Sequence, residues 1–308
     1  MKEVGEVKER NDRENGARVG AFFDLDGTLL AGPSLERRFF RMLRYRRAIG
    51  VRNYLLWLGE AARLAPRGIL AILQANKMYL RGVRVVEGDG GIGGAANSDA
   101  RGGPGGMGAA RTRVPTFFSE AVERVGWHAS QGHAIVIVSG TLELLARGAA
   151  RALEGELAAR GRTTEVHALG TRLEEAAGSW TGRIAGEAMF GEEKARAVRR
   201  LAAAWGLDLA RSYAYGDSTY DRWMLAAVGR PAAVNAGEEL RGIARLHGWP
   251  EMRWKAKRSD ADGRSEVLHS AWGQRYEKRR GGAETEPALG MTETNSEKIR
   301  PMKLGSLG

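Results

Sequence analysis

The chain has 308 residues, a formal net charge of +11 and no cysteine. Without cysteine the chain forms neither disulfides nor thiolate metal sites. A charged N-terminus and apolar runs no longer than about five residues exclude a secretory signal and a membrane-spanning helix, so we expect a soluble, cytoplasmic protein.

The positive charge is concentrated in one segment. Residues 33–85 carry twelve basic and two acidic side chains, whereas residues 1–18 carry five of each sign. The segment 1–18 also lacks any apolar periodicity, which predicts a disordered leader. The basic excess therefore belongs to a part of the chain that is distinct from its ends.

The stretch from Ala21 to Leu30 predicts a buried strand that ends in a functional site. The expected strand spans about 19–24 and ends in Asp24, and Asp26 follows two residues later. Residues two apart on a strand point the same way, so both carboxyls are expected at the C-terminal mouth of the strand, where open α/β sheets bind ligands. Two acids this close in an apolar setting require a cation or a shared proton.

Helical spacing dominates the segment that follows. Three amphipathic patterns, at about 34–47, 53–64 and 67–79, have no strand between them and predict a helical cap over 33–85. Residues 86–113 contain ten glycines and read as a flexible linker. Gly88, Gly90 and Gly93 match a dinucleotide-binding pattern, but the residues that follow them do not favour the helix that such a site needs.

Strand and helix patterns alternate through the rest of the chain. The pattern predicts an α/β fold with a doubly wound, Rossmann-like, mainly parallel sheet, whose core comprises 19–32 and 114–254. We read residues 255–308 as a disordered tail. The expected elements are a helix over 115–131, a strand over 134–138, a helix over 142–160, a strand over 166–169, a hairpin within 180–189, a helix over 192–205, and strands over 212–215 and 232–235.

Three further polar stretches stand at the ends of strands or the start of a helix. Ser139-Gly140-Thr141 follows the second strand, Gly191-Glu192-Glu193-Lys194 opens a helix, and Asp217 with Asp221 follows the strand at 212–215. Each of these is weak or moderate evidence alone, since a lysine such as Lys194 is most often a surface residue. Together with Asp24-Leu25-Asp26-Gly27-Thr28, in this order, they resemble the four motifs of the haloacid dehalogenase superfamily.

The resemblance implies a Mg²⁺-dependent phosphatase. Asp24 would be the nucleophile that forms an aspartyl-phosphate, and Asp26 would serve as general acid and base. Ser139, Gly140 and Lys194 would bind the phosphoryl group. Mg²⁺ would be held by Asp24, the backbone carbonyl of Asp26 and Asp217, with Asp221 supporting.

The cap position and the form of the last motif are similar to the phosphoserine-phosphatase-like subfamily. In that subfamily an acidic residue nine positions after the nucleophile binds the substrate amine, and here Pro33 occupies that position while Glu36 is out of register. This difference argues against phosphoserine as the substrate. We expect a small phosphorylated substrate of unspecified identity.

Two other readings of the basic cap stay open at this stage. Arg37, Arg41 and Arg44 would form one cationic stripe on a helix, which could guide a small anion or contact an anionic membrane that carries a lipid-like phosphate. Nucleic-acid binding is not expected, because the arginines alternate with core-type apolar residues and no binding motif is present. The sequence predicts no oligomeric state.

Overall fold

The computed structural model describes residues 18–69, 72, 74, 76–84 and 116–255, which lie in one compact unit of the chain. The predicted leader over 1–18, apart from Arg18, lies outside the described residues. So do the predicted linker over 86–113 and, apart from Lys255, the predicted tail over 255–308.

A six-stranded sheet organises the core, and every pair of neighbouring strands in it is parallel. Its order is β3-β2-β1-β6-β7-β8, which places β1 in the centre. This arrangement confirms the predicted mainly parallel α/β sheet. The strands are β1 (Gly20–Phe23), β2 (Ala134–Leu142), β3 (Val166–Thr171), β6 (Tyr213–Gly216), β7 (Arg230–Val234) and β8 (Glu251–Met252).

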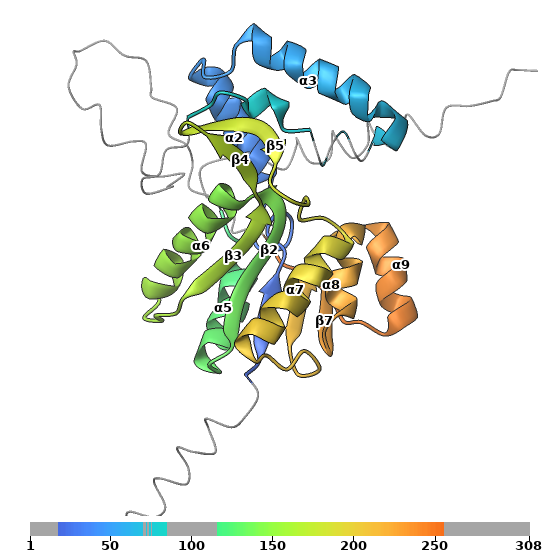
Figure 1. Ribbon diagram of the computed structural model, residues 1–308. Helices are drawn as coiled ribbons and strands as arrows, with labels where there is room; N and C mark the ends of the chain where they lie inside the picture. The colour runs from blue at the N-terminus through green and yellow to red at the C-terminus, as the bar shows by residue number, and fades with distance from the viewer. Residues whose placement is uncertain (1–17, 70–71, 73, 75, 85–115, 256–308) are drawn as a thin grey trace, which may run out of the picture. The chain divides into compact units, whose positions relative to one another are not determined.

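Helices cover both faces of the sheet, as a doubly wound fold requires (Figure 1). On β1, Ala21 and Phe23 pack with α5 and α6, whereas Phe22 points to the other face, with α7, α8 and α9. This alternation follows from the period of two along a strand. The helices are α5 (Ser119–Ser130), α6 (Glu143–Ala158), α7 (Glu192–Trp205), α8 (Arg222–Ala226) and α9 (Glu238–His247).

The cap segment begins as two helices. α2 (Leu35–Tyr45) follows the N-cap Ser34, whose hydroxyl accepts a hydrogen bond from the amide of Arg37, and α3 is Val51–Leu64. The third predicted helix, 67–79, is confirmed in part, because the described residues 69, 72 and 74 are helical. Its predicted end is wrong, since residues 76 and 77 are not helical and η2 (Met78–Leu80) is a separate 3₁₀ turn.

The predicted hairpin lies earlier than expected. It joins β4 (Leu173–Ala176) to β5 (Ser179–Ile184), so its turn is Ala177-Gly178, before the predicted range 180–189. Both turn residues have positive φ, 50° and 69°, as a two-residue hairpin turn requires. The hairpin also contacts the cap segment, because Trp180 exchanges backbone hydrogen bonds with Gly82 and Val83.

Several boundaries differ from the sequence-based expectation. α5 starts at Ser119 instead of 115, because residues 116–118 run extended beside the loop after β1. β2 continues past Val138 to Leu142, which pairs with β3 after a register shift. Two helices, α8 and α9, and the short strand β8 were not predicted. No helix in the described parts of the chain is long and apolar enough to cross a membrane.

A buried histidine links α5 to the sheet. His128 is fully buried, its Nδ1 lies 2.7 Å from Nδ1 of His133, and its Nε2 lies 3.0 Å from the hydroxyl of Tyr215. Burial, with the nearby His133 and Arg124, lowers the pKa of His128 to about 3. The folded protein therefore holds this imidazole neutral at pH values where the unfolded chain protonates it.

We expect His128 to make the protein less stable in mild acid. Its folded pKa lies below its unfolded value, so the unfolded state binds more protons between about pH 6.5 and pH 3, and the free energy of unfolding falls as the pH falls through that window. From pH 7 to pH 5 this one group removes about 2 kcal/mol. Urea unfolding at both pH values should show a shallower pH dependence for His128→Phe than for wild type. The exposed control His247→Phe should match wild type, and an unchanged slope in His128→Phe would contradict the assignment.

Candidate active site

Asp24 and Asp26 follow β1 at the centre of the sheet. Asp24 is 6% exposed, and its amide donates to the carbonyl of Tyr215 at 2.9 Å, which continues the pairing of β1 with β6. Asp26 lies beyond the end of the strand, and its Oδ1 accepts a hydrogen bond from the amide of Leu35 at 2.9 Å. That amide opens α2, so the Asp26 side chain ties the loop after β1 to the first helix of the cap.

Gly27 is the residue that permits this loop. Its φ is +95°, and a Cβ at this position would lie 2.2 Å from Oδ2 of Asp217. Only glycine combines that conformation with so close an approach. The loop after β1 therefore packs directly against a carboxylate that follows β6.

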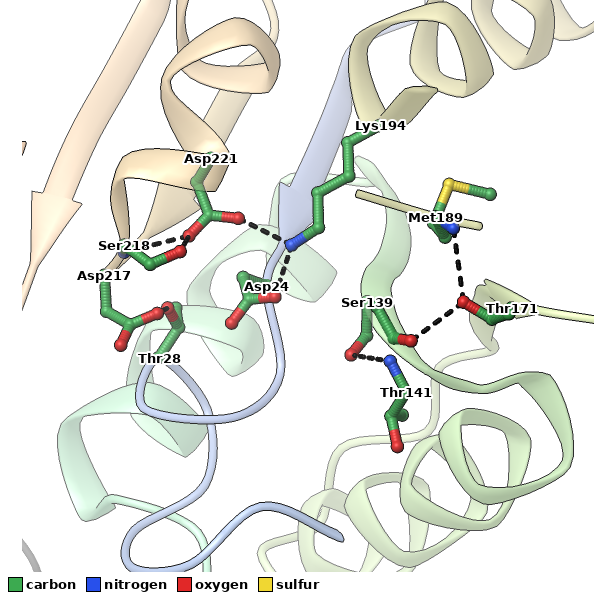
Figure 2. Close-up of polar contacts among 11 residues, drawn as sticks. Asp24, Thr28, Ser139, Thr141, Thr171, Met189, Lys194, Asp217, Ser218 and Asp221 are labelled. Carbon is green, nitrogen blue, oxygen red and sulfur yellow. Dashed lines mark hydrogen bonds and ion pairs between the residues drawn. The ribbon is translucent and has the colours of Figure 1, made fainter. Parts of the chain in front are cut away.

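Lys194 joins two of the carboxylates (Figure 2). It lies in the first turn of α7 and is 3% exposed; its Nζ donates to Oδ1 of Asp24 at 2.6 Å and to Oδ1 of Asp221 at 2.5 Å. The second oxygen of Asp221 accepts hydrogen bonds from the amide and the hydroxyl of Ser218, at 3.0 and 2.8 Å. Both oxygens of Asp221 are thus engaged by protein donors, and this side chain positions the lysine.

The carboxylate of Asp217 makes fewer hydrogen bonds to the described residues than the carboxylate of Asp221. Its Oδ1 lies 3.4 Å from the hydroxyl of Thr28, a long contact, and its side chain points towards Asp24 (Figure 2). One carboxylate oxygen from each of Asp24, Asp217 and Asp221 can be chosen so that all three lie within 4.8 Å of one another. The structure therefore brings three of the predicted metal residues together, while the carboxylate of Asp26 is not part of this cluster.

Burial and mutual repulsion oppose ionisation of these carboxylates. Burial raises the pKa of Asp24 to about 7, although the Lys194 ammonium opposes the shift. Burial, followed by the charges of Asp24 and Asp221, raises the pKa of Asp217 to about 9. Burial also opposes the charge of Lys194, but the Asp221 and Asp24 carboxylates outweigh it and raise the pKa of that amine.

The charge balance of the cluster matches a divalent cation. Three ionised carboxylates and one ammonium leave two uncompensated negative charges, and the available donors are oxygens, which suit Mg²⁺. A divalent cation would favour the ionised forms that burial disfavours. The residues present therefore fit the metal that the sequence motifs imply.

Ser139 and Gly140 lie within β2, and Figure 2 shows Ser139 on the opposite side of Asp24 from Asp217. The Ser139 hydroxyl accepts a hydrogen bond from the amide of Thr141 at 3.2 Å. The Gly140 carbonyl accepts one from the hydroxyl of Thr171 at 2.8 Å, which in turn accepts one from the amide of Met189. These bonds fix the polypeptide beside the carboxylates.

Two residues of this region were not in the predicted site. The Thr141 hydroxyl is buried and has no hydrogen-bond partner among the described residues. Phe190 packs over Gly140, where a Cβ would lie 2.4 Å from its ring. Thr141 follows Ser139-Gly140 directly, which could have drawn attention to it, whereas no sequence signal singles out Phe190.

These groups line one cavity of about 230 Å³. All residues of the predicted site line this cavity except Asp221, which contacts the lining residue Lys194. Two cap residues, Ser34 and Glu36, also line it, whereas Pro33 is exposed and does not. The lining residues are Asp24, Asp26, Ser34, Glu36, Ser139, Gly140, Thr141, Phe190, Lys194, Asp217, Ser218 and Tyr220.

The chain is similar to curated bacterial proteins. A probable phosphatase of Mycobacterium tuberculosis is 40% identical over 139 residues, which are 45% of this chain and 45% of that protein. A phosphoserine phosphatase of the same species is 45% identical over 94 residues, 30% of either chain. The match thus spans less than half the length of these relatives.

A solved structure and a family model extend the similarity. The crystal structure of a Bordetella pertussis protein of unknown function is 28% identical, with a TM-score of 0.55, over 77% of this chain and 99% of that one. The family model of haloacid dehalogenase-like hydrolases matches residues 21–226, which include all four predicted motifs. The chain belongs to the family of haloacid dehalogenase-like hydrolases.

Proposed function

We propose that the protein is a Mg²⁺-dependent phosphatase that hydrolyses a small phosphomonoester through an aspartyl-phosphate on Asp24. The observation that carries the proposal is the contact of the Lys194 ammonium with Asp24 and Asp221, beside the carboxylate of Asp217. This arrangement places the Asp24 carboxylate in the wall of a cavity that the Lys194 ammonium and the Ser139 hydroxyl also line. The names of the phosphatase relatives agree with it.

In the first step, an oxygen of Asp24 attacks the phosphorus of the bound ester. The bond from phosphorus to the leaving alcohol breaks, and Asp26 donates its proton to the alkoxide. Burial raises the pKa of Asp26, with the Leu35 amide opposing, so this carboxyl is suited to hold a proton before it acts as an acid. Ser139, Gly140 and Lys194 bind the phosphoryl oxygens.

In the second step, Asp26 accepts a proton from water as that water attacks the phosphorus of the aspartyl-phosphate. Inorganic phosphate leaves and the Asp24 carboxylate is regenerated. Mg²⁺, held by Asp24, Asp217 and the backbone carbonyl of Asp26, would supply positive charge that offsets the phosphoryl charge. Asp221 acts indirectly, since its oxygens already bind Lys194 and Ser218.

A release assay tests the proposed activity. Purified protein is incubated with a panel of phosphomonoesters, with Mg²⁺ or with a chelator, and inorganic phosphate is measured. We expect release that depends on Mg²⁺ from at least one ester. No release from any member of a broad panel would contradict the proposed function.

Gly27→Ala is expected to weaken Mg²⁺ binding. An added Cβ would lie 2.2 Å from the Asp217 carboxylate and displace it, and disturbed ligand geometry typically lowers metal affinity by about ten- to a hundredfold. Gly132→Ala is the matched control, because Gly132 also has positive φ, +71°, but has no atom within 4 Å of an added Cβ. Calorimetric titration should show weakened binding for Gly27→Ala only. Equal Mg²⁺ affinity in the two variants would show that the loop after β1 does not shape the metal site.

A further inference from the structure

The cavity of about 230 Å³ that Asp24 lines is called the catalytic cavity below. A second cavity, of about 480 Å³, opens in the cap next to it. The two share Ser34, Glu36 and Phe190 as lining residues, so they adjoin at the start of α2. Its volume lies in the range of small-molecule binding pockets. We call it the cap pocket; its lining residues are Ser34, Glu36, Arg37, Phe40, Tyr54, Trp57, Lys77, Tyr79 and Phe190.

The walls of the cap pocket are largely aromatic. Phe40 of α2 makes edge-to-face contacts with Tyr54 of α3 and Tyr79 of η2, at ring-centroid distances of 6.4 and 5.2 Å. Trp57 lies one turn after Tyr54 on α3 and also lines the pocket. Five aromatic rings, counting Phe190, therefore face a space that continues into the catalytic cavity.

Hydrogen bonds hold these walls in place. The side-chain amide of Asn53 donates to the carbonyls of Tyr79 and Arg81, at 3.1 and 2.7 Å. That of Asn76 donates to the carbonyl of Trp57 at 2.8 Å. All three bonds connect α3 to the segment around η2 and hold Trp57 and Tyr79 in place relative to each other.

Two of the three charged residues that line the cap pocket, Glu36 and Lys77, neutralise each other, while the third, Arg37, is exposed to solvent. The Lys77 side chain is 4% exposed, and its Nζ lies 2.5 Å from Oε1 of Glu36. The Tyr79 hydroxyl donates to the same oxygen at 2.6 Å. Glu36 is thus the acidic residue nearest the catalytic cavity in the cap, yet its charge is balanced by a buried lysine.

We propose that the cap pocket binds the leaving group of the substrate, and that this group is an uncharged, apolar alcohol with an alkyl or aryl body. The proposal rests on the phosphatase function proposed above and specifies the substrate class. An apolar body that covers the aromatic walls would remove both its own surface and theirs from water, which favours binding. An ammonium group on the leaving group would instead lie beside the Lys77 ammonium, without a free carboxylate to pair with.

The test compares phosphomonoesters that share the phosphate and differ in the leaving group. We expect wild type to hydrolyse n-octyl phosphate with a kcat/KM at least about tenfold above that for phosphoethanolamine or phosphoserine. Trp57→Ala should lower kcat/KM for n-octyl phosphate by about ten- to a hundredfold, mainly through KM, and change that for methyl phosphate less than about threefold. A methyl group offers very little apolar area to cover the aromatic walls, so methyl phosphate reports whether the variant is folded and active.

Leu58→Ala is the matched control on α3, because Leu58 is 56% exposed and does not line the cap pocket. It should leave the rates for both esters unchanged. An equal fall for methyl and octyl phosphate in Trp57→Ala and in the second pocket variant Phe40→Leu, or a wild type that prefers phosphoserine, would overturn the assignment. Octyl phosphate is offered both free in solution and within phosphatidylcholine vesicles; turnover of either form supports the pocket, and the better form identifies a soluble or a membrane-borne source.

A binding measurement separates this inference from the proposed activity. By calorimetry, wild type should bind n-octylphosphonate at least about tenfold more tightly than methylphosphonate, and Trp57→Ala should lose the difference. Equal affinity for the two phosphonates overturns the cap-pocket assignment even if esters are hydrolysed. Tighter octylphosphonate binding without hydrolysis of any ester supports the pocket and contradicts the phosphatase function instead.

Discussion

Asp24→Asn is expected to lower turnover by about four or more orders of magnitude while the protein stays folded. The amide is nearly isosteric with the carboxylate, but it lacks the anionic oxygen that attacks phosphorus in the proposed mechanism. Losing a nucleophile typically costs this much or more, because the remaining groups cannot replace the covalent step. Initial rates of phosphate release with the best ester of the panel, measured at saturating Mg²⁺, give the comparison.

Asp208→Asn is the matched control for this change. Asp208 lies in the turn before β6, where its Oδ1 accepts a hydrogen bond from the amide of Ala210 at 2.9 Å, and it is not part of the catalytic cavity. It should retain wild-type turnover. Residual activity of Asp24→Asn above about 1% of wild type would argue against covalent catalysis at this residue.

Lys194→Met is expected to cause a large loss of stability. Lys194 is 3% exposed and supplies positive charge to Asp24 and Asp221 at 2.6 and 2.5 Å. Removing one partner of a buried ion pair typically costs about 3–5 kcal/mol, because the other partner stays buried without compensation. For a folded region of this size, that loss lowers the melting temperature by on the order of 10 °C.

Thermal and urea unfolding with and without Mg²⁺ measure this effect. Lys255→Met, at an exposed lysine after β8, should stay within about 0.5 kcal/mol of wild type. Mg²⁺ should restore part of the stability of Lys194→Met, since a ligand that binds only the folded state stabilises it. A Lys194→Met variant as stable as wild type without Mg²⁺ would contradict the charge balance described for the cluster.

The site residues could be predicted from sequence because short motifs combine with a simple topological rule. Asp24 and Asp217 each follow a strand of a parallel sheet, Ser139 lies in the C-terminal half of β2, and the carboxyl ends of such strands meet at one edge. Their mutual approach therefore follows from strand order without any knowledge of side-chain packing. Strand order does not predict the contact of Lys194 with two carboxylates, because that contact depends on how α7 packs on the sheet.

The cap could be predicted only in part, for reasons that are physical. α2 and α3 have clear amphipathic patterns, and Ser34 is a clear N-cap. The predicted position of the hairpin was wrong because both residues of the turn Ala177-Gly178 have positive φ, and an alanine in the sequence does not indicate that conformation. The pair Glu36–Lys77 joins residues 41 positions apart, a contact that no local pattern encodes.

The central claim is that Asp24 carries the phosphoryl group during turnover. The most direct test is to quench the enzyme during turnover of its best ester, reduce acyl phosphates with borohydride, and map the peptides by mass spectrometry. Reduction converts an aspartyl-phosphate to homoserine, so the proposed mechanism predicts homoserine at position 24, only when ester is present, and none in Asp24→Asn. Turnover that leaves position 24 unreduced, or that places the modification at Asp26, would contradict it.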